Sequence, residues 1–195
     1  METDLTKIRI AGEQQLKENM KFRAFLKGHC SLSTQELDRL VHELTREVAA
    51  QIDCDACRKC CDLAPVVEVG ELPRLAAVLG MSVGDFRRRH VKPPQFGEIE
   101  LMPPCPFLRE EGGRRYCIAG DAKPTLCAEY PFLMKPDFWT RLVGVVENYG
   151  RCPIVYNVYE RLKERLRPEF QKAKPAVEEW FVWEESGTVE WDEEE

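Results

Sequence analysis

The stretch CDACRKCC, residues 54–61, places four cysteines within eight consecutive positions. Cys54, Cys57 and Cys60 are spaced by three residues, so a curled loop or a single helical turn can direct their sulfur atoms toward one point. Cys61 directly follows Cys60 and points elsewhere, which indicates a second site, a bridging ligand or a thiol that binds nothing. The triplet spacing is typical of a metal site.

Four more cysteines follow in turn-rich sequence, and two of them precede a proline. These are Cys105, Cys117, Cys127 and Cys152. A structural zinc needs four soft ligands in a tetrahedron, and a cubane iron–sulfur cluster needs four thiolates around a larger inorganic core. Bacterial ferredoxins have the same CxxCxxC triplet followed by a Cys-Pro, although their Cys-Pro lies much nearer to the triplet than it does here. This similarity favours an iron–sulfur cluster, of the 4Fe-4S type, slightly over zinc. All eight cysteines are candidate metal ligands.

The composition is that of a globular protein without a general affinity for polyanions. The 195 residues are 44% hydrophobic and 32% charged, and the net charge of −6 argues against binding to nucleic acid or anionic lipid. The N-terminus lacks the apolar run of a signal peptide, and no stretch approaches the roughly 18 apolar residues of a membrane span. We therefore expect a cytoplasmic protein whose partners are a metal and another protein, not a membrane or nucleic acid.

The cytoplasmic expectation bears on the cysteines, because cytosolic thiols are normally kept reduced. Nine cysteines in such a protein indicate metal binding or catalysis before disulfides. The three histidines are assigned no ligand role. The basic run RRRH, residues 87–90, is expected to be a solvated face.

Helical periodicity is clearest outside the region around Cys105 and Cys127. Residues 33–52 repeat apolar side chains at helical spacing behind a Ser33/Glu36 capping box. Other helices are expected at about 13–26, 71–79, 83–90 and 154–166, and short strands at 65–69, 98–102, 114–118 and 138–146. Residues 93–137 hold most of the thirteen prolines and have little periodicity.

These elements predict an α+β fold, a small irregular metal-centred domain with flanking helices and short strands. Three segments are expected. They are an N-terminal helical segment (1–53), a cysteine-rich metal-binding domain (54–153), and a C-terminal helix with an acidic aromatic tail (154–195).

The order of the cysteine motifs resembles a known family. CDACRKCC is followed by CPFL at 105–108, CIAGDAKPTLCAEYPF at 117–132 and CP at 152–153. This arrangement is similar to the zinc- or iron-chelating CxxCxxCC family, and the resemblance implies a cysteine-rich metal-binding domain over about residues 54–153. Members usually have an arginine at the positions of Lys123 and Ala128, so this chain departs from the pattern there.

The resemblance also leaves alternative functions open. Flagellin lysine N-methylases contain a similar domain, which makes a protein-modifying enzyme of that kind one alternative, and a zinc-stabilised interaction module is another. The sequence shows no glycine-rich strand-to-helix turn for a nucleotide or methyl donor. Metal binding is therefore the predicted function, with enzyme activity undecided and no catalytic residue assigned.

Overall fold

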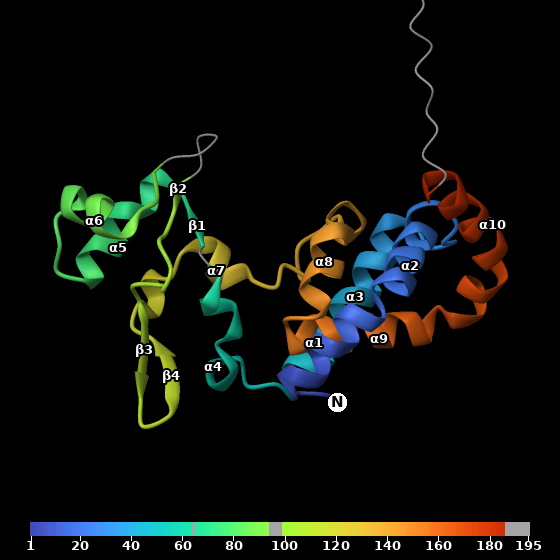
Figure 1. The fold of residues 1–195 in the computed structure, drawn as a ribbon, viewed down its shortest axis with the longest axis horizontal. Coiled ribbons are helices and arrows are strands. Elements are labelled where there is room, and N and C mark those ends of the chain that lie inside the picture. Colours follow the sequence, from blue (N-terminus) through green and yellow to red (C-terminus); the bar gives the residue numbers. More distant parts are fainter. Residues whose placement is uncertain (64, 94–98, 186–195) are drawn as a thin grey trace, which may run out of the picture. The chain divides into compact units, whose positions relative to one another are not determined.

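The computed structural model describes residues 1–63, 65–93 and 99–185 (Figure 1). The chain forms two compact units: unit 1 comprises Met1–Arg46 and Lys135–Glu195, and unit 2 comprises Glu47–Met134. Unit 1 is helical, and both small sheets lie in unit 2. The predicted α+β class is confirmed, with helices dominating. The acidic end of the predicted tail, residues 186–195, lies outside the described residues.

Unit 1 is an assembly of helices around an aromatic core. Its elements are α1 (Leu5–Gln14), α2 (Leu16–Gly28), most of α3 (Thr34–Ala49), η4 (Phe138–Arg141), α8 (Leu142–Tyr149), α9 (Pro153–Arg165) and α10 (Arg167–Glu185). Helix α2 packs against α8 and α10. The ring of Phe22 in α2 meets Tyr159 and Phe170 edge-on, with centroids 5.4 and 5.2 Å away. Such edge contacts stabilise a core beyond the area that they bury.

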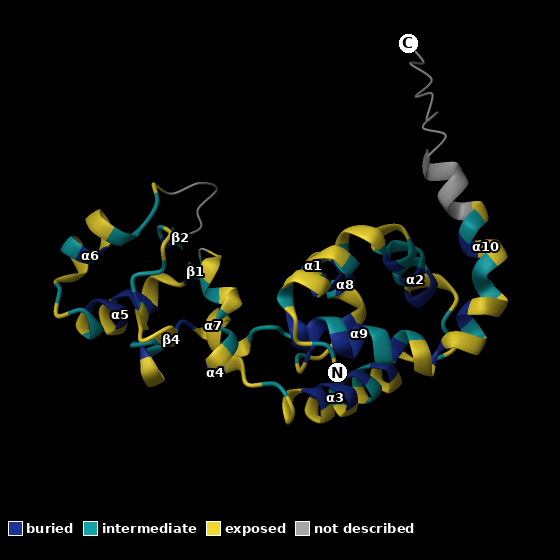
Figure 2. Cartoon of the chain, turned by 60° about the horizontal axis from the view of Figure 1, so that its bottom comes forward, coloured by how far each residue is buried: buried dark blue, intermediate teal, exposed yellow. Residues whose placement is uncertain are grey.

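Helix α3 forms as the sequence predicts. The backbone N–H of Ser33 donates to Glu36 Oε2 at 2.9 Å, and the N–H of Glu36 donates to Ser33 Oγ at 3.3 Å. This reciprocal capping box satisfies donors that would otherwise have no partner at the helix start. Leu37, Val41 and Val48 on the apolar face are buried. Figure 2 shows buried stretches alternating with exposed ones along α3. The periodic pattern therefore identified the core side of this helix correctly.

Two predictions for unit 1 are corrected. The helix expected at 13–26 is two helices, α1 and α2, which meet at Gln15, and α1 begins earlier because Asp4 accepts from the N–H groups of Thr6 and Lys7. The strand expected at 138–146 is wrong, because this stretch forms η4 and the start of α8. Its valines resemble a strand locally, but Leu142, Val145 and Val146 bury one helical face.

Close backbone packing joins α1 to the end of α8. A Cβ built on Gly12 would lie 2.6 Å from the Cα of Gly150, a distance that real Cβ atoms do not adopt. Glycine is therefore required at Gly12 by this approach rather than by its backbone angles.

Unit 2 contains short helices and two small antiparallel sheets. The helical elements are α4 (Cys54–Cys57), η1 (Lys59–Asp62), η2 (Val69–Glu71), α5 (Leu72–Val78), α6 (Val83–His90), η3 (Gly120–Ala122) and α7 (Thr125–Glu129). Strand β1 (Val66–Val67) pairs with β2 (Ile99–Glu100), and β3 (Leu108–Glu111) pairs with β4 (Arg114–Cys117). Both residues of the turn between β3 and β4, Gly112 and Gly113, have positive φ angles, as a tight hairpin requires.

The core of unit 2 lies between α5, α6 and the segment that leads into β3. Leu72, Leu75, Phe86, Leu101 and Phe107 are almost completely buried. Cys105 and Cys117 are partly buried and pack against this cluster. The apolar core thus positions two of the candidate ligands at its edge.

Within the described residues, none of the helices is both long and apolar enough to cross a bilayer.

Candidate metal centre

The cysteine motif at 54–61 folds into two short helical turns separated by a reversal. Asp53 caps the first turn, α4, because its Oδ1 accepts from the N–H of Ala56 at 3.0 Å. Arg58 adopts a left-handed backbone conformation, which ends α4 and starts η1. Cys54 and Cys57 therefore lie on one turn, and Cys60 and Cys61 lie on the next.

The β3–β4 hairpin lies against this motif. Helix α4 packs against β4, which ends at Cys117. Arg115 on β4 forms an ion pair with Asp62, the residue after Cys61. Hydrogen bonds from Lys59 and Arg115 lower the pKa of Asp62, so its carboxylate is charged near neutral pH. This ion pair links the motif to the strand that carries Cys117.

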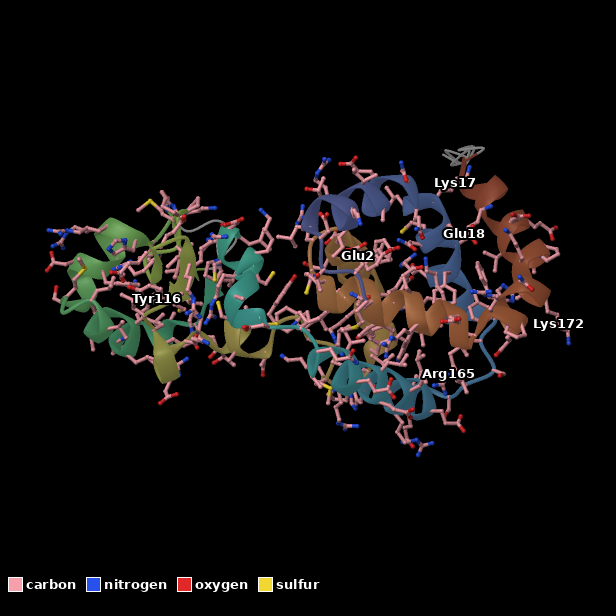
Figure 3. The ribbon with its side chains drawn as sticks, turned by 90° about the horizontal axis from the view of Figure 1, so that it is seen from below. Glu2, Lys17, Glu18, Tyr116, Arg165 and Lys172 are labelled. Atoms are coloured by element: carbon pink, nitrogen blue, oxygen red, sulfur yellow. The ribbon has the colours of Figure 1, made fainter. Side chains whose placement is uncertain are left out.

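Strand alternation separates the two faces of β4. Arg115 and Cys117 are partly buried, whereas Arg114 and Tyr116 are exposed. Tyr116 lies on the exposed side of the hairpin, where its hydroxyl donates to Glu111 Oε2 at 3.2 Å (Figure 3). Cys117 therefore faces the motif side of the hairpin with Arg115.

Cys127 is carried by α7, and a buried carboxylate holds that helix in place. Glu71 accepts from the backbone N–H of Thr125 at 2.8 Å and from its hydroxyl at 2.7 Å, and it forms an ion pair with Arg74. Arg74 also donates to the carbonyl of Lys123 at 3.1 Å. Burial alone would raise the pKa of Glu71, but hydrogen bonds from the N–H groups of Glu68 and Thr125 and from the Thr125 hydroxyl lower it overall.

Five thiols of unit 2 lie in one neighbourhood. Desolvation of its sulfur atom, followed by the nearby thiols of Cys105, Cys61 and Cys117, raises the pKa of Cys127 to about 12, although the residue as a whole is exposed. Burial also raises the pKa of Cys105, and Cys61 and Cys117 add to this rise. A hydrogen bond with Cys60 is the largest cause of the raised pKa of Cys61. These thiols are therefore near enough to disfavour one another's ionisation.

The sulfur donors fit a metal by their chemistry. Thiolates are ligands for zinc and for iron–sulfur clusters, and a bound cation compensates the repulsion between neighbouring thiolates. The described residues nevertheless include no set of three or more His, Cys, Asp or Glu side chains already arranged to hold a metal ion. The thiols are neighbours rather than a closed coordination shell.

The other cysteines occupy different places. Cys54 and Cys57 lie on α4, which packs against β4. Cys152 lies in unit 1, at the start of α9, where it is buried and its N–H donates to the carbonyl of Asn148 at 2.9 Å. Cys30, which the sequence did not nominate, also belongs to unit 1. Seven of the eight candidate ligands thus belong to unit 2.

The sequence did not predict the residue pairs that hold the cysteine-bearing elements in place. Glu71 and Thr125 are separated by 54 positions, and Asp62 and Arg115 by 53. No periodicity or motif spacing relates residues that far apart, so only the fold reveals that these pairs position Cys127 and Cys117.

A family model described as "Putative zinc- or iron-chelating domain", named CxxCxxCC, matches residues 53–187. Comparisons with curated proteins and with solved structures found no significant match. The matched range covers more than half of the chain and includes all eight candidate ligands. The chain therefore belongs to the CxxCxxCC family of zinc- or iron-chelating domains.

Proposed function

We propose that the protein binds an iron–sulfur cluster through cysteine thiolates of unit 2. Membership of a zinc- or iron-chelating family supports metal binding in general. The observation that carries the finer proposal is the thiol neighbourhood of Cys60, Cys61, Cys105, Cys117 and Cys127. Its members come from η1, from β4, from α7 and from the segment before β3, so the fold itself gathers them.

The spacing of Cys54, Cys57 and Cys60 supports a cluster over a single zinc ion, because bacterial ferredoxins hold their clusters with the same CxxCxxC triplet. A polynuclear iron core is larger and is held by thiolates from several segments. When bound, the cluster would supply electron transfer or Lewis-acid chemistry.

Two polar interactions would position the elements that carry the ligands. Asp62 and Arg115 keep η1 beside β4, and Glu71 keeps α7 at its position. The seven candidate cysteines of unit 2 form the proposed ligand set of this centre, and Cys152 in unit 1 stays a predicted ligand.

Elemental analysis of protein purified without oxygen tests this proposal. We expect iron and acid-labile sulfide, a brown colour, and broad absorption at roughly 400 nm from thiolate-bound clusters. Colourless protein that contains stoichiometric zinc would contradict the cluster proposal and show that the site binds zinc. Protein that binds neither metal, even after reconstitution with iron and sulfide or with zinc, would refute the metal-binding proposal.

A further inference from the structure

Unit 2 contains an open pocket of about 570 Å³ whose lining includes one proposed metal ligand, Cys105. Two arginines line it: Arg89 from the end of α6, and Arg109 from β3. The remaining wall is largely apolar, formed by Met102, Leu108 and three prolines between them. A pocket with an apolar wall and a few charged groups is typical of a small-molecule site.

Neither arginine forms an ion pair with a carboxylate among the described residues, unlike two cations close to them in the sequence. Arg88 is paired with Asp85, and Lys92 is paired with Glu100. Arg109 instead donates from Nη1 to the carbonyls of Pro106 and Leu108, at 2.8 and 2.9 Å. These bonds hold its guanidinium against the pocket wall without neutralising its charge.

His90 supplies a second observation. It lines the same pocket, and its Nε2 is buried with no hydrogen-bond partner in the described part of the chain. Buried polar atoms without partners are uncommon and require an explanation. Burial and the charge of Arg89 lower the pKa of His90, so its imidazole adds no positive charge to the pocket near neutral pH.

One acidic side chain also lines the pocket. Glu110 lies opposite Arg115 in the β3–β4 hairpin, so a cation faces it across the strand pair. The charge of Glu110 is therefore directed partly toward Arg115, and the two unpaired arginines leave the pocket positive. This is a local exception in a chain whose net charge is −6.

We propose that this pocket binds an organic carboxylate with a short apolar body. A guanidinium presents two parallel N–H donors that match the two oxygens of a carboxylate. Met102, Leu108 and the prolines provide the surface for the apolar body. Cys105 lines the same pocket, so the bound molecule would lie beside a proposed metal ligand, but the argument for the pocket does not depend on the metal.

Calorimetry on the full-length protein in its purified metal state tests the proposal with three probes at constant ionic strength. These are hexanoate, its neutral amide hexanamide, and inorganic phosphate. We expect saturable binding of hexanoate. Hexanamide lacks the charge and phosphate lacks the apolar body, so each should bind at least about tenfold more weakly than hexanoate. No saturable binding of hexanoate would overturn the proposal, and equal binding of phosphate would overturn the organic part of it.

Variants locate the site. Arg89→Gln and Arg109→Gln should each weaken hexanoate binding about fivefold, the range expected for a solvent-exposed ion pair. Arg114→Gln makes the same charge change at the far end of the same hairpin and should leave the affinity unchanged. Equal effects of all three substitutions, or no effect of any, would contradict the assignment to this pocket.

The melting temperature and the metal content of each sample separate the possible failures. Where Arg109→Gln lowers the melting temperature, Arg109→Lys keeps the charge and should restore stability but only part of the hexanoate affinity. Because the metal content is measured independently, protein without metal would refute the proposed function while the hexanoate titration still decides the pocket.

Discussion

The buried carboxylate of Glu71 holds the backbone N–H and the hydroxyl of Thr125, at 2.8 and 2.7 Å, across 54 positions of sequence. Thr125 opens α7, and Cys127 follows in its first turn. The backbone of Glu68 and the side chain of Arg74 occupy the rest of the carboxylate. A single side chain therefore determines where the helix of one candidate ligand begins.

Substitution of Glu71 should weaken both the fold and the metal site. Glu71→Ala removes the charged acceptor shared by the N–H groups of Glu68 and Thr125 and the Thr125 hydroxyl, and we expect a loss of about 2 kcal/mol in the free energy of unfolding. Urea denaturation measures this loss, and competition with a chelator measures metal affinity. Asp121→Ala, which removes an exposed carboxylate from the same unit, is the matched control and should change neither quantity. Equal behaviour of the two variants would show that Glu71 has no positioning role.

The same carboxylate predicts a dependence of stability on pH. The pKa of Glu71 is lower in the folded protein than its ordinary value of 4.5, so its contribution is present above about pH 4.5. That contribution is lost as the pH falls through the lower, folded-state pKa. Acidification should therefore destabilise the wild-type protein more than Glu71→Gln, as measured by urea denaturation over this range. Parallel pH profiles for the two proteins would contradict the prediction.

Substitution of single cysteines tests the thiol neighbourhood. Cys117→Ser and Cys127→Ser each remove a soft ligand, and we expect each variant to lose most of its bound iron because a hydroxyl is a poor replacement for a thiolate. Cys30→Ser alters a thiol in unit 1 outside the proposed ligand set and should retain the wild-type iron content. Iron retained by both unit 2 variants would place the ligands elsewhere.

Much of the fold, but less of the site, could be predicted from the sequence. Repeated apolar residues identified α3, and the helix expected at 83–90 is α6, where the Ser82 side chain accepts from the N–H of Asp85. Both elements were predictable because their signals are local. The strand predicted at 138–146 is wrong because the valines of this stretch favour a strand locally. The stretch forms a helix instead, whose apolar face is buried against the rest of unit 1. Cysteine spacing nominated the ligands, but only the folded chain shows that Cys117 and Cys127 are neighbours.

The contact between Gly12 and Gly150 provides a test confined to unit 1. Gly12→Ala places a Cβ 2.6 Å from the Cα of Gly150, so α1 must move, and we expect a loss of about 1 to 3 kcal/mol in the free energy of unfolding. Gly144→Ala adds the same methyl group where nothing lies within 4 Å, and it should not destabilise the protein. Denaturation curves compare the two, and a Gly12→Ala protein as stable as wild type would refute the steric argument.

Removal of the metal should loosen the middle of the chain and leave α3 largely intact. Residues 105–130 contain one hairpin and the short elements η3 and α7, so few of their backbone groups are paired in regular structure. Their order depends on the core contacts of Cys105 and Cys117, on Glu71, and on the proposed metal. Helix α3 has its own capping box and a buried apolar face in unit 1.

Metal binding can contribute on the order of 10 kcal/mol to folding, which is comparable with the net stability of a whole domain. Hydrogen exchange on chelated and metal-bound protein should therefore show protection lost across 105–130 and retained in α3. Unchanged protection across 105–130 would mean that the metal is bound by an independently stable fold, and its role would then be chemical rather than structural.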